Sequence, residues 1–175
     1  MRTTISLLLF FVVLIPKIDG KSVPTNISLA IQPKIIGGQR LSIHERPYML
    51  SLHRRQAGFQ CGAFIISAQW GITAQHCFPL METSAYVVRA GSDEFQKGGT
   101  LHRLTEIIVY DTTLYDEKVP ISDIALFKVN PHFKFSSSVQ PALLPTAGTF
   151  PNPKVLVVTG WGSLRPRSST NKLRG

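Results

Sequence analysis

Residues 67–77 read Ser-Ala-Gln-Trp-Gly-Ile-Thr-Ala-Gln-His-Cys, and this stretch decides the fold that the sequence predicts. It places His76 beside Cys77, at the end of an apolar run that is typical of a β-strand. A second cysteine, Cys61, lies 16 residues earlier, and the chain has 2 cysteines in all. If the two form a disulfide, His76 is held at the mouth of a closed loop, which suits a general base.

The N-terminus has the features of a secretory signal peptide, which we assign to residues 1–20. Arg2 precedes an unbroken apolar run from Leu7 to Ile15, and Pro16 and Gly20 follow it. The run is shorter than the roughly 20 apolar residues that cross a bilayer, so we expect no membrane span. The alternative is a buried hydrophobic helix. A signal peptide predicts a secreted, extracellular protein.

Secretion makes a disulfide between Cys61 and Cys77 the natural pairing, because an oxidising compartment allows it. Closing a loop of this size stabilises a fold by roughly 3 kcal/mol in the chain-entropy model. The alternative is a pair of free, buried thiols.

The composition suits one globular domain: 175 residues, 43% hydrophobic and 17% charged. The formal net charge is +9, and residues 1–34 contribute four bases and one acid to it. After Asp123 every charged residue is basic. This asymmetry predicts either an ordinary solvated surface or an affinity for an anionic polymer such as a polysaccharide. We expect no specific nucleic-acid partner.

Short β-strands separated by turn residues account for most of the chain. The expected strands are rich in β-branched, aromatic and aliphatic residues. They cover residues 48–53, 59–66, 70–74, 85–90, 101–109, 124–129 and 155–159. Because no stretch keeps a helical period over three turns, the sequence predicts an all-β sandwich or barrel. The basic, polar residues 163–175 predict a mobile tail.

Three motifs give the chain a resemblance to the trypsin/chymotrypsin family of secreted serine proteases. Residues 73–77 resemble the family's Thr-Ala-Ala-His-Cys motif, with Gln75 replacing the second alanine. Residues 122–126 carry Asp123 before an apolar strand, and residues 158–162 resemble the family's Gly-Trp-Gly segment. The resemblance runs from about residue 35 to residue 164. It implies a trypsin-like Greek-key β-barrel, with the first barrel present and the second largely missing.

The resemblance implies a catalytic role for His76 and Asp123. His76 would be the general base, and Asp123 would fix its tautomer and stabilise the imidazolium that forms during the reaction. Taken alone, Asp123 could equally be a turn residue or a cap. The remaining histidines have no such setting and predict surface or satisfied core positions: His44, His53, His102 and His132.

The nucleophile of the family is missing, since the sequence contains no Gly-Asp-Ser-Gly-Gly signature. The resemblance therefore implies a secreted serine endopeptidase truncated before its serine, acting on proteins or peptides but inactive as written. The alternative is a non-catalytic homologue that binds a partner such as a protease. Residues 91–96 occupy the place of the family's calcium loop and look shortened, so we expect no metal site and no cofactor.

Residues 34–38, Lys-Ile-Ile-Gly-Gly, resemble the family's activation site. Cleavage between Lys34 and Ile35 would free the amino terminus of Ile35, and the lysine implies an activating protease with trypsin-like preference. Residues 21–34 would then be a pro-segment, and residues 35–175 a protease domain that is incomplete at its C-terminal end. Asn26 lies in an Asn-Ile-Ser acceptor for N-glycosylation.

Overall fold

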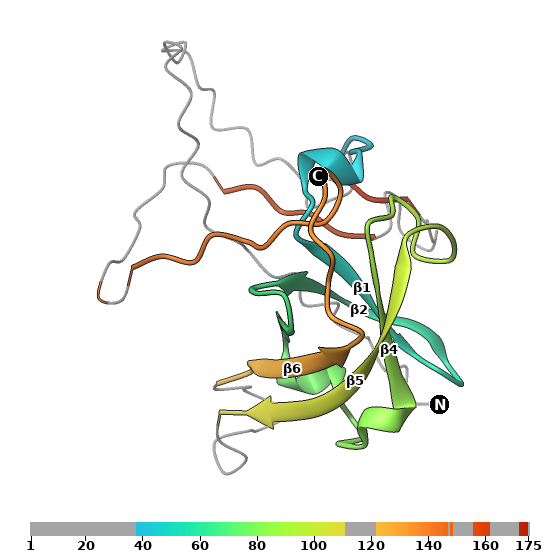
Figure 1. Cartoon of the computed structure of the whole chain (residues 1–175), viewed down its shortest axis with the longest axis vertical. Coiled ribbons are helices and arrows are strands. Elements are labelled where there is room, and N and C mark those ends of the chain that lie inside the picture. Colours follow the sequence, from blue (N-terminus) through green and yellow to red (C-terminus); the bar gives the residue numbers. More distant parts are fainter. Residues whose placement is uncertain (1–37, 111–121, 147, 149–155, 162–171, 175) are drawn as a thin grey trace, which may run out of the picture.

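The computed structural model describes residues 38–110, 122–146, 148, 156–161 and 172–174. Within these ranges six β-strands form a closed barrel (Figure 1). They are β1 (Met49–Arg54), β2 (Gly58–Ile65), β3 (Trp70–Thr73), β4 (Tyr86–Ala90), β5 (Thr100–Val109) and β6 (Ala125–Asn130). The helical elements of the same ranges are short 3₁₀ turns: η1 (Ile43–Glu45), η2 (Gln75–Cys77) and η3 (Thr83–Ala85). No helix among these residues is long and apolar enough to cross a membrane.

The barrel is antiparallel throughout, and its order is β1-β2-β3-β6-β5-β4, closed by the pairing of β4 with β1. β6 lies between β3 and β5, so the last strand of the described residues fills the gap between two earlier ones. The all-β barrel predicted from the sequence is therefore confirmed. Six of the seven expected strands are present, each with ends within one residue of the expected ones.

The main core fills the inside of the barrel. Buried and less buried residues alternate along β4 and β6, which is the pattern of strands with one buried face. Phe127, on β6, is fully buried and packs across Gly71 on β3. A Cβ atom at residue 71 would lie 2.3 Å from the ring of Phe127, so only glycine fits at this position.

A second apolar cluster lies on the outer side of β1 and β2. Its buried members are Ile43, Tyr48, Met49, Phe64, Ala142, Trp161 and Leu173. Asp93, in the connection between β4 and β5, links members of this cluster by accepting hydrogen bonds from them. Its Oδ1 accepts from the backbone N–H of Ile43 at 2.5 Å. Its carbonyl accepts from Trp161 Nε1 and from the backbone N–H of Leu173, each at 2.8 Å.

Two expectations for the C-terminal part are wrong. Of the expected strand 155–159, the described residues 156–159 form no ladder: Val158 makes an isolated bridge, and Gly160 just beyond it bridges to Arg174, whereas a strand needs a ladder partner along its length. The expected mobile tail includes Leu173, which is fully buried in the second cluster and hydrogen-bonded through its backbone to Asp93 and Leu41. Leu173 is an apolar residue in a polar segment, and it fills a space in the second cluster. The average composition of residues 163–175 does not indicate this.

His53 lies on the outer face of β1, where its Nε2 is 2.9 Å from the hydroxyl oxygen of Ser51. Its ring packs against the rings of Phe59 and Phe95, with centroids 6.0 and 6.1 Å away. Burial, and secondly the charge of Arg89, lower the pKa of His53 to about 4. His53 is therefore neutral in the fold at neutral pH.

His102, on β5, is a buried histidine with both ring nitrogens hydrogen-bonded. Its Nδ1 donates to the carbonyl of Pro131 at 2.6 Å, and its Nε2 lies 2.7 Å from the hydroxyl of Thr100, which donates to it. Burial lowers the pKa of His102, and the bond to Pro131 opposes that effect. The expectation that His102 is a satisfied core residue is met.

The packing of Phe127 makes a testable prediction for Gly71. The change Gly71→Ala forces Phe127 or the backbone of β3 to move, and we expect it to lower the free energy of unfolding by about 1–3 kcal/mol. The matched control is Gly62→Ala on β2, because a Cβ there meets Met49 at an ordinary 3.8 Å. Chemical denaturation of both variants measures the difference, and equal losses would contradict this account of the barrel.

The two neutral histidines predict that acid destabilises the fold. Because the folded-state pKa values of His53 and His102 lie below that of a free histidine, the unfolded chain binds more protons. Their stabilisation is complete above the unfolded pKa of about 6.5 and is lost as the pH falls towards 4. We expect His53→Gln to flatten this dependence, and His132→Gln, at an exposed position, to preserve it. Thermal unfolding across the range checks this, and an unchanged slope in His53→Gln would contradict it.

Candidate active site

His76 lies in η2, the single 3₁₀ turn that follows β3. Two backbone hydrogen bonds close the turn, from Cys77 to Ala74 at 3.2 Å and from Phe78 to Gln75 at 2.9 Å. Cys77 and Phe78 are buried in the main core, with exposed fractions of 1% and 3%. The residues on the C-terminal side of His76 thus anchor the turn, while the His76 side chain stays 26% exposed.

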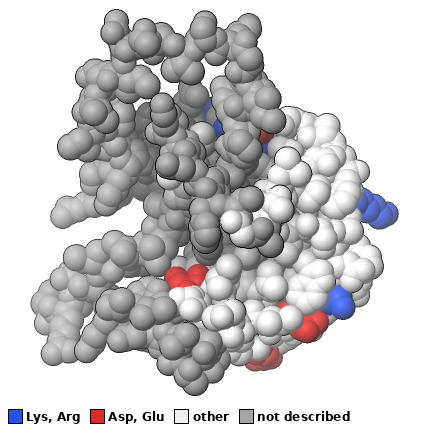
Figure 2. All heavy atoms as spheres, turned by 90° about the vertical axis from the view of Figure 1, so that its left-hand side faces the viewer, with Lys and Arg blue, Asp and Glu red and all other residues white. Residues whose placement is uncertain are grey.

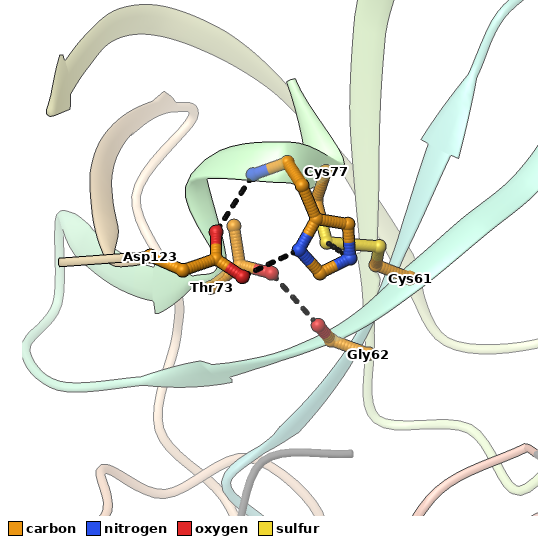
Figure 3. Close-up of a disulfide and its surroundings, with 6 residues drawn as sticks. Cys61, Gly62, Thr73, Cys77 and Asp123 are labelled. Carbon is orange, nitrogen blue, oxygen red and sulfur yellow. Dashed lines mark hydrogen bonds and ion pairs between the residues drawn. A yellow bond between two sulfur atoms is a disulfide. The ribbon is translucent and has the colours of Figure 1, made fainter. Parts of the chain in front are cut away.

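A disulfide joins Cys77 to Cys61 on β2, with a Cα–Cα distance of 6.1 Å. The expected pairing is therefore present. A second link lies beside it, because the hydroxyl of Thr73 donates to the carbonyl of Gly62 at 2.9 Å (Figure 3). Together these links tie the end of β3 to the middle of β2. The backbone that carries His76 is fixed covalently on one side and by a side-chain hydrogen bond on the other.

Asp123 binds His76 through both of its carboxylate oxygens. Oδ2 lies 2.7 Å from the ring Nδ1, and Oδ1 accepts from the backbone N–H of His76 at 2.9 Å (Figure 3). The Asp123 side chain is 12% exposed. An ionised carboxylate at this depth is costly unless donors satisfy it, and here one residue supplies both donors.

Strand pairing explains how two residues 47 positions apart meet. β3 and β6 are antiparallel, and their register places Thr73 opposite Ala125. His76 follows Thr73 in the sequence and Asp123 precedes Ala125, so both residues lie just beyond the same end of this ladder. Closing the barrel therefore brings the carboxylate to the imidazole.

Ser122 sets the direction of the chain before β6. It adopts the left-handed conformation, with φ 63°, and the backbone N–H of Ile124 donates to its carbonyl at 2.7 Å. This tight turn encloses Asp123 and aims its side chain at η2. Sequence reasoning did not single out Ser122, because a serine before a strand carries no signal for a positive φ.

The hydrogen bonds of His76 define its tautomer. A carboxylate accepts and does not donate, so Nδ1 carries the proton and Nε2 keeps its lone pair. Nε2 lies 3.6 Å from Cys77 Sγ, a disulfide sulfur that has no proton to give. Among the described residues, nothing donates a hydrogen bond to Nε2. The imidazole is therefore arranged to accept a proton at this atom.

The same residues do not suit a metal ion. Cys61, His76 and Cys77 have possible ligand atoms within 4.8 Å of one another. Both sulfurs belong to the disulfide, however, and cannot act as thiolate ligands.

The other residues singled out in the sequence take no described part in the His76–Asp123 pair. Lys34, Ile35 and Asn26 lie outside the described residues. Gln75, which replaces an alanine of the motif, has a buried side-chain oxygen with no hydrogen-bond partner in the described part of the chain. His132 is exposed, as expected for a histidine without a functional setting.

Comparisons with known proteins relate this chain to the trypsins. Residues 35–175 match the sequence profile of the trypsin family. The chain is 36% identical over 136 residues to a trypsin of Phaedon cochleariae. This alignment covers 74% of this chain and 50% of that protein. It is 29% identical over 166 residues to trypsin delta of Drosophila melanogaster, which covers 93% of this chain and 64% of that protein.

The fold is similar to the crystal structure of a scabies mite inactivated protease paralogue. The TM-score is 0.71 at 24% identity, over 79% of this chain and 59% of that chain. The chain spans between 50% and 64% of the length of the two trypsins. With the profile match over residues 35–175 and a closed barrel of the same fold, the chain belongs to the trypsin family of serine proteases.

Proposed function

We propose that this chain carries the general-base half of a serine endopeptidase, with His76 as the base and Asp123 as the residue that orients it. The observation that supports this most directly is the 2.7 Å contact between Nδ1 and Oδ2, with Nε2 left free to accept a proton. In the reaction, Nε2 takes the proton of a serine hydroxyl as the oxygen attacks the peptide carbonyl. Asp123 stabilises the imidazolium that results.

The serine itself is not among these 175 residues, since no Gly-Asp-Ser-Gly-Gly signature is present. The backbone donors that would stabilise the oxyanion belong to that same signature. Without the serine and those donors, a positioned base has nothing to deprotonate and no charge to stabilise. We therefore expect the 175-residue chain by itself to hydrolyse no peptide bonds.

We further propose that the protein is made as a secreted zymogen. The features that support this are a signal peptide over residues 1–20, a pro-segment over residues 21–34 and a basic residue at Lys34 before Ile35. A protease with trypsin-like preference would cut this bond and release the domain that starts at residue 35. Protein or peptide substrates follow from the family.

A non-catalytic secreted homologue is the second candidate, in which the His76–Asp123 pair would be retained without a nucleophile. It would keep the fold and bind a partner such as a protease. An anionic polysaccharide has less support. On the face shown in Figure 2, Lys and Arg side chains of the described residues are scattered and lie among Asp and Glu rather than in one basic patch.

The catalytic proposal is tested by reading the transcript beyond the codon for Gly175 and expressing the whole frame. In a frame that contains the serine signature, we expect Asp123→Asn to lower kcat by about 10⁴-fold, the loss known for this carboxylate in serine-protease triads. His76→Ala should lose at least as much. The control is His132→Ala, an exposed histidine, which should retain full activity.

Two results would contradict the proposal. One is substantial peptidase activity in His76→Ala, measured with a chromogenic peptide after activation. The other is labelling of the 175-residue chain by a fluorophosphonate, which would reveal a reactive serine that the sequence does not predict. A frame that stops after Gly175, with no labelling, supports the non-catalytic homologue instead.

A further inference from the structure

The connection between β4 and β5, residues 91–99, turns consecutive backbone carbonyls towards its own interior. The carbonyls of Phe95, Gln96 and Gly98 accept hydrogen bonds from the guanidinium of Arg89. Those of Glu94 and Lys97 lie within hydrogen-bond distance of the Ser92 hydroxyl, at 2.9 and 2.6 Å. Three of these oxygens thus meet one positively charged group, and backbone carbonyl oxygens gathered in this way are the kind of ligand that a hard cation binds.

Arg89 reaches this point from the barrel wall. It lies on β4 directly opposite Ser51 of β1, on the outer face of the strand. Nε donates to the carbonyl of Phe95 at 3.0 Å, Nη2 donates to Gln96 at 3.3 Å, and Nη1 donates to Gly98. One planar, permanently charged group therefore supplies donors to three residues of the loop.

The loop is also held from outside. The ring of Phe95 packs on that of Phe59 at a centroid distance of 4.6 Å. Glu94 forms an ion pair with Lys172, and Asp93 accepts from the backbone N–H of Leu173 through its carbonyl. The position of the loop thus decides where residues 172–174 dock against the second apolar cluster.

The residues present do not fit the calcium ion that the family resemblance associates with this loop. Calcium takes six to eight oxygen ligands and favours carboxylates among them. Here the Asp93 carboxylate is engaged by the backbone N–H of Ile43, and Glu94 pairs with Lys172 and with Lys97, the latter at 3.5 Å. A calcium ion at the carbonyls would also have to displace the guanidinium of Arg89 or lie against its positive charge.

We infer that the guanidinium of Arg89 takes the place of a metal ion in residues 91–99. It is the positive charge that the backbone carbonyls of this loop bind. The loop, and the docking of residues 172–174 that depends on it, are consequently independent of calcium. This inference does not depend on any catalytic role for His76. A truncated or non-catalytic chain would need the same support.

The test compares thermal unfolding of the 175-residue chain in calcium chloride and in EDTA. We expect the same Tm in both, because a ligand stabilises a fold only if the native state binds it. The variant Arg89→Met should unfold at a lower temperature in both solutions. Amide hydrogen exchange at residues 92–99 should become about tenfold faster or more in this variant, since the loop loses charge-assisted hydrogen bonds.

The matched control is Arg103→Met on β5. Arg103 is exposed, and none of the described residues forms a hydrogen bond or ion pair with its side chain, so loop exchange should stay at the wild-type rate. Arg89→Glu places a carboxylate among the carbonyls, and its Tm should rise by several degrees with calcium.

A wild-type Tm that rises with calcium overturns the inference, and this measurement needs no variant. Unchanged loop exchange in Arg89→Met also overturns it. A folded Arg89→Glu protein that ignores calcium would show that the carbonyls do not form a cation site.

Discussion

The structure depends on the pairing of β3 with β6. β6 is the last strand in the described part of the chain, and its insertion between β3 and β5 closes the barrel. The pairing requires close approach at one point, where the buried ring of Phe127 takes the space that a side chain at Gly71 would occupy. The same ladder ends at Thr73 and Ala125, so it also brings Asp123 to His76. The strand pairing that closes the barrel therefore also assembles the site.

The sequence predicted the barrel strands well because β-branched, aromatic and aliphatic residues concentrate in them, and glycine and proline mark their ends. His76 and Asp123 were found through short motifs whose spacing reflects a shared fold. Leu173 was missed, because its burial depends on a gap made by residues far away, including Trp161 and Ile43. The expected strand at residues 155–159 is reduced to isolated bridges in the described part of the chain for the same reason, since ladder partners are a tertiary property that local composition does not encode.

Two loops of this domain are fixed by different means. The loop that carries His76 is closed by a disulfide, which acts largely by restricting the unfolded chain. The loop of residues 91–99 is held by the charge of Arg89, which acts only in the folded state, where the carbonyls of Phe95 and Gln96 converge. Reduction would therefore lower the free energy of unfolding of the whole domain, whereas loss of the guanidinium would first loosen residues 91–99 and the contact with Leu173.

The paired histidine and aspartate serve stability as well as chemistry. Asp123 is 12% exposed, and its two oxygens depend on the ring and the backbone of His76 for donors. Removing the imidazole would leave a largely buried carboxylate with one donor fewer, which costs free energy whether or not a substrate is ever cleaved. In a non-catalytic homologue, loss of the imidazole alone would therefore still destabilise the fold. Activity is decided on the Nε2 side of the ring, by whether a serine hydroxyl is brought to that atom.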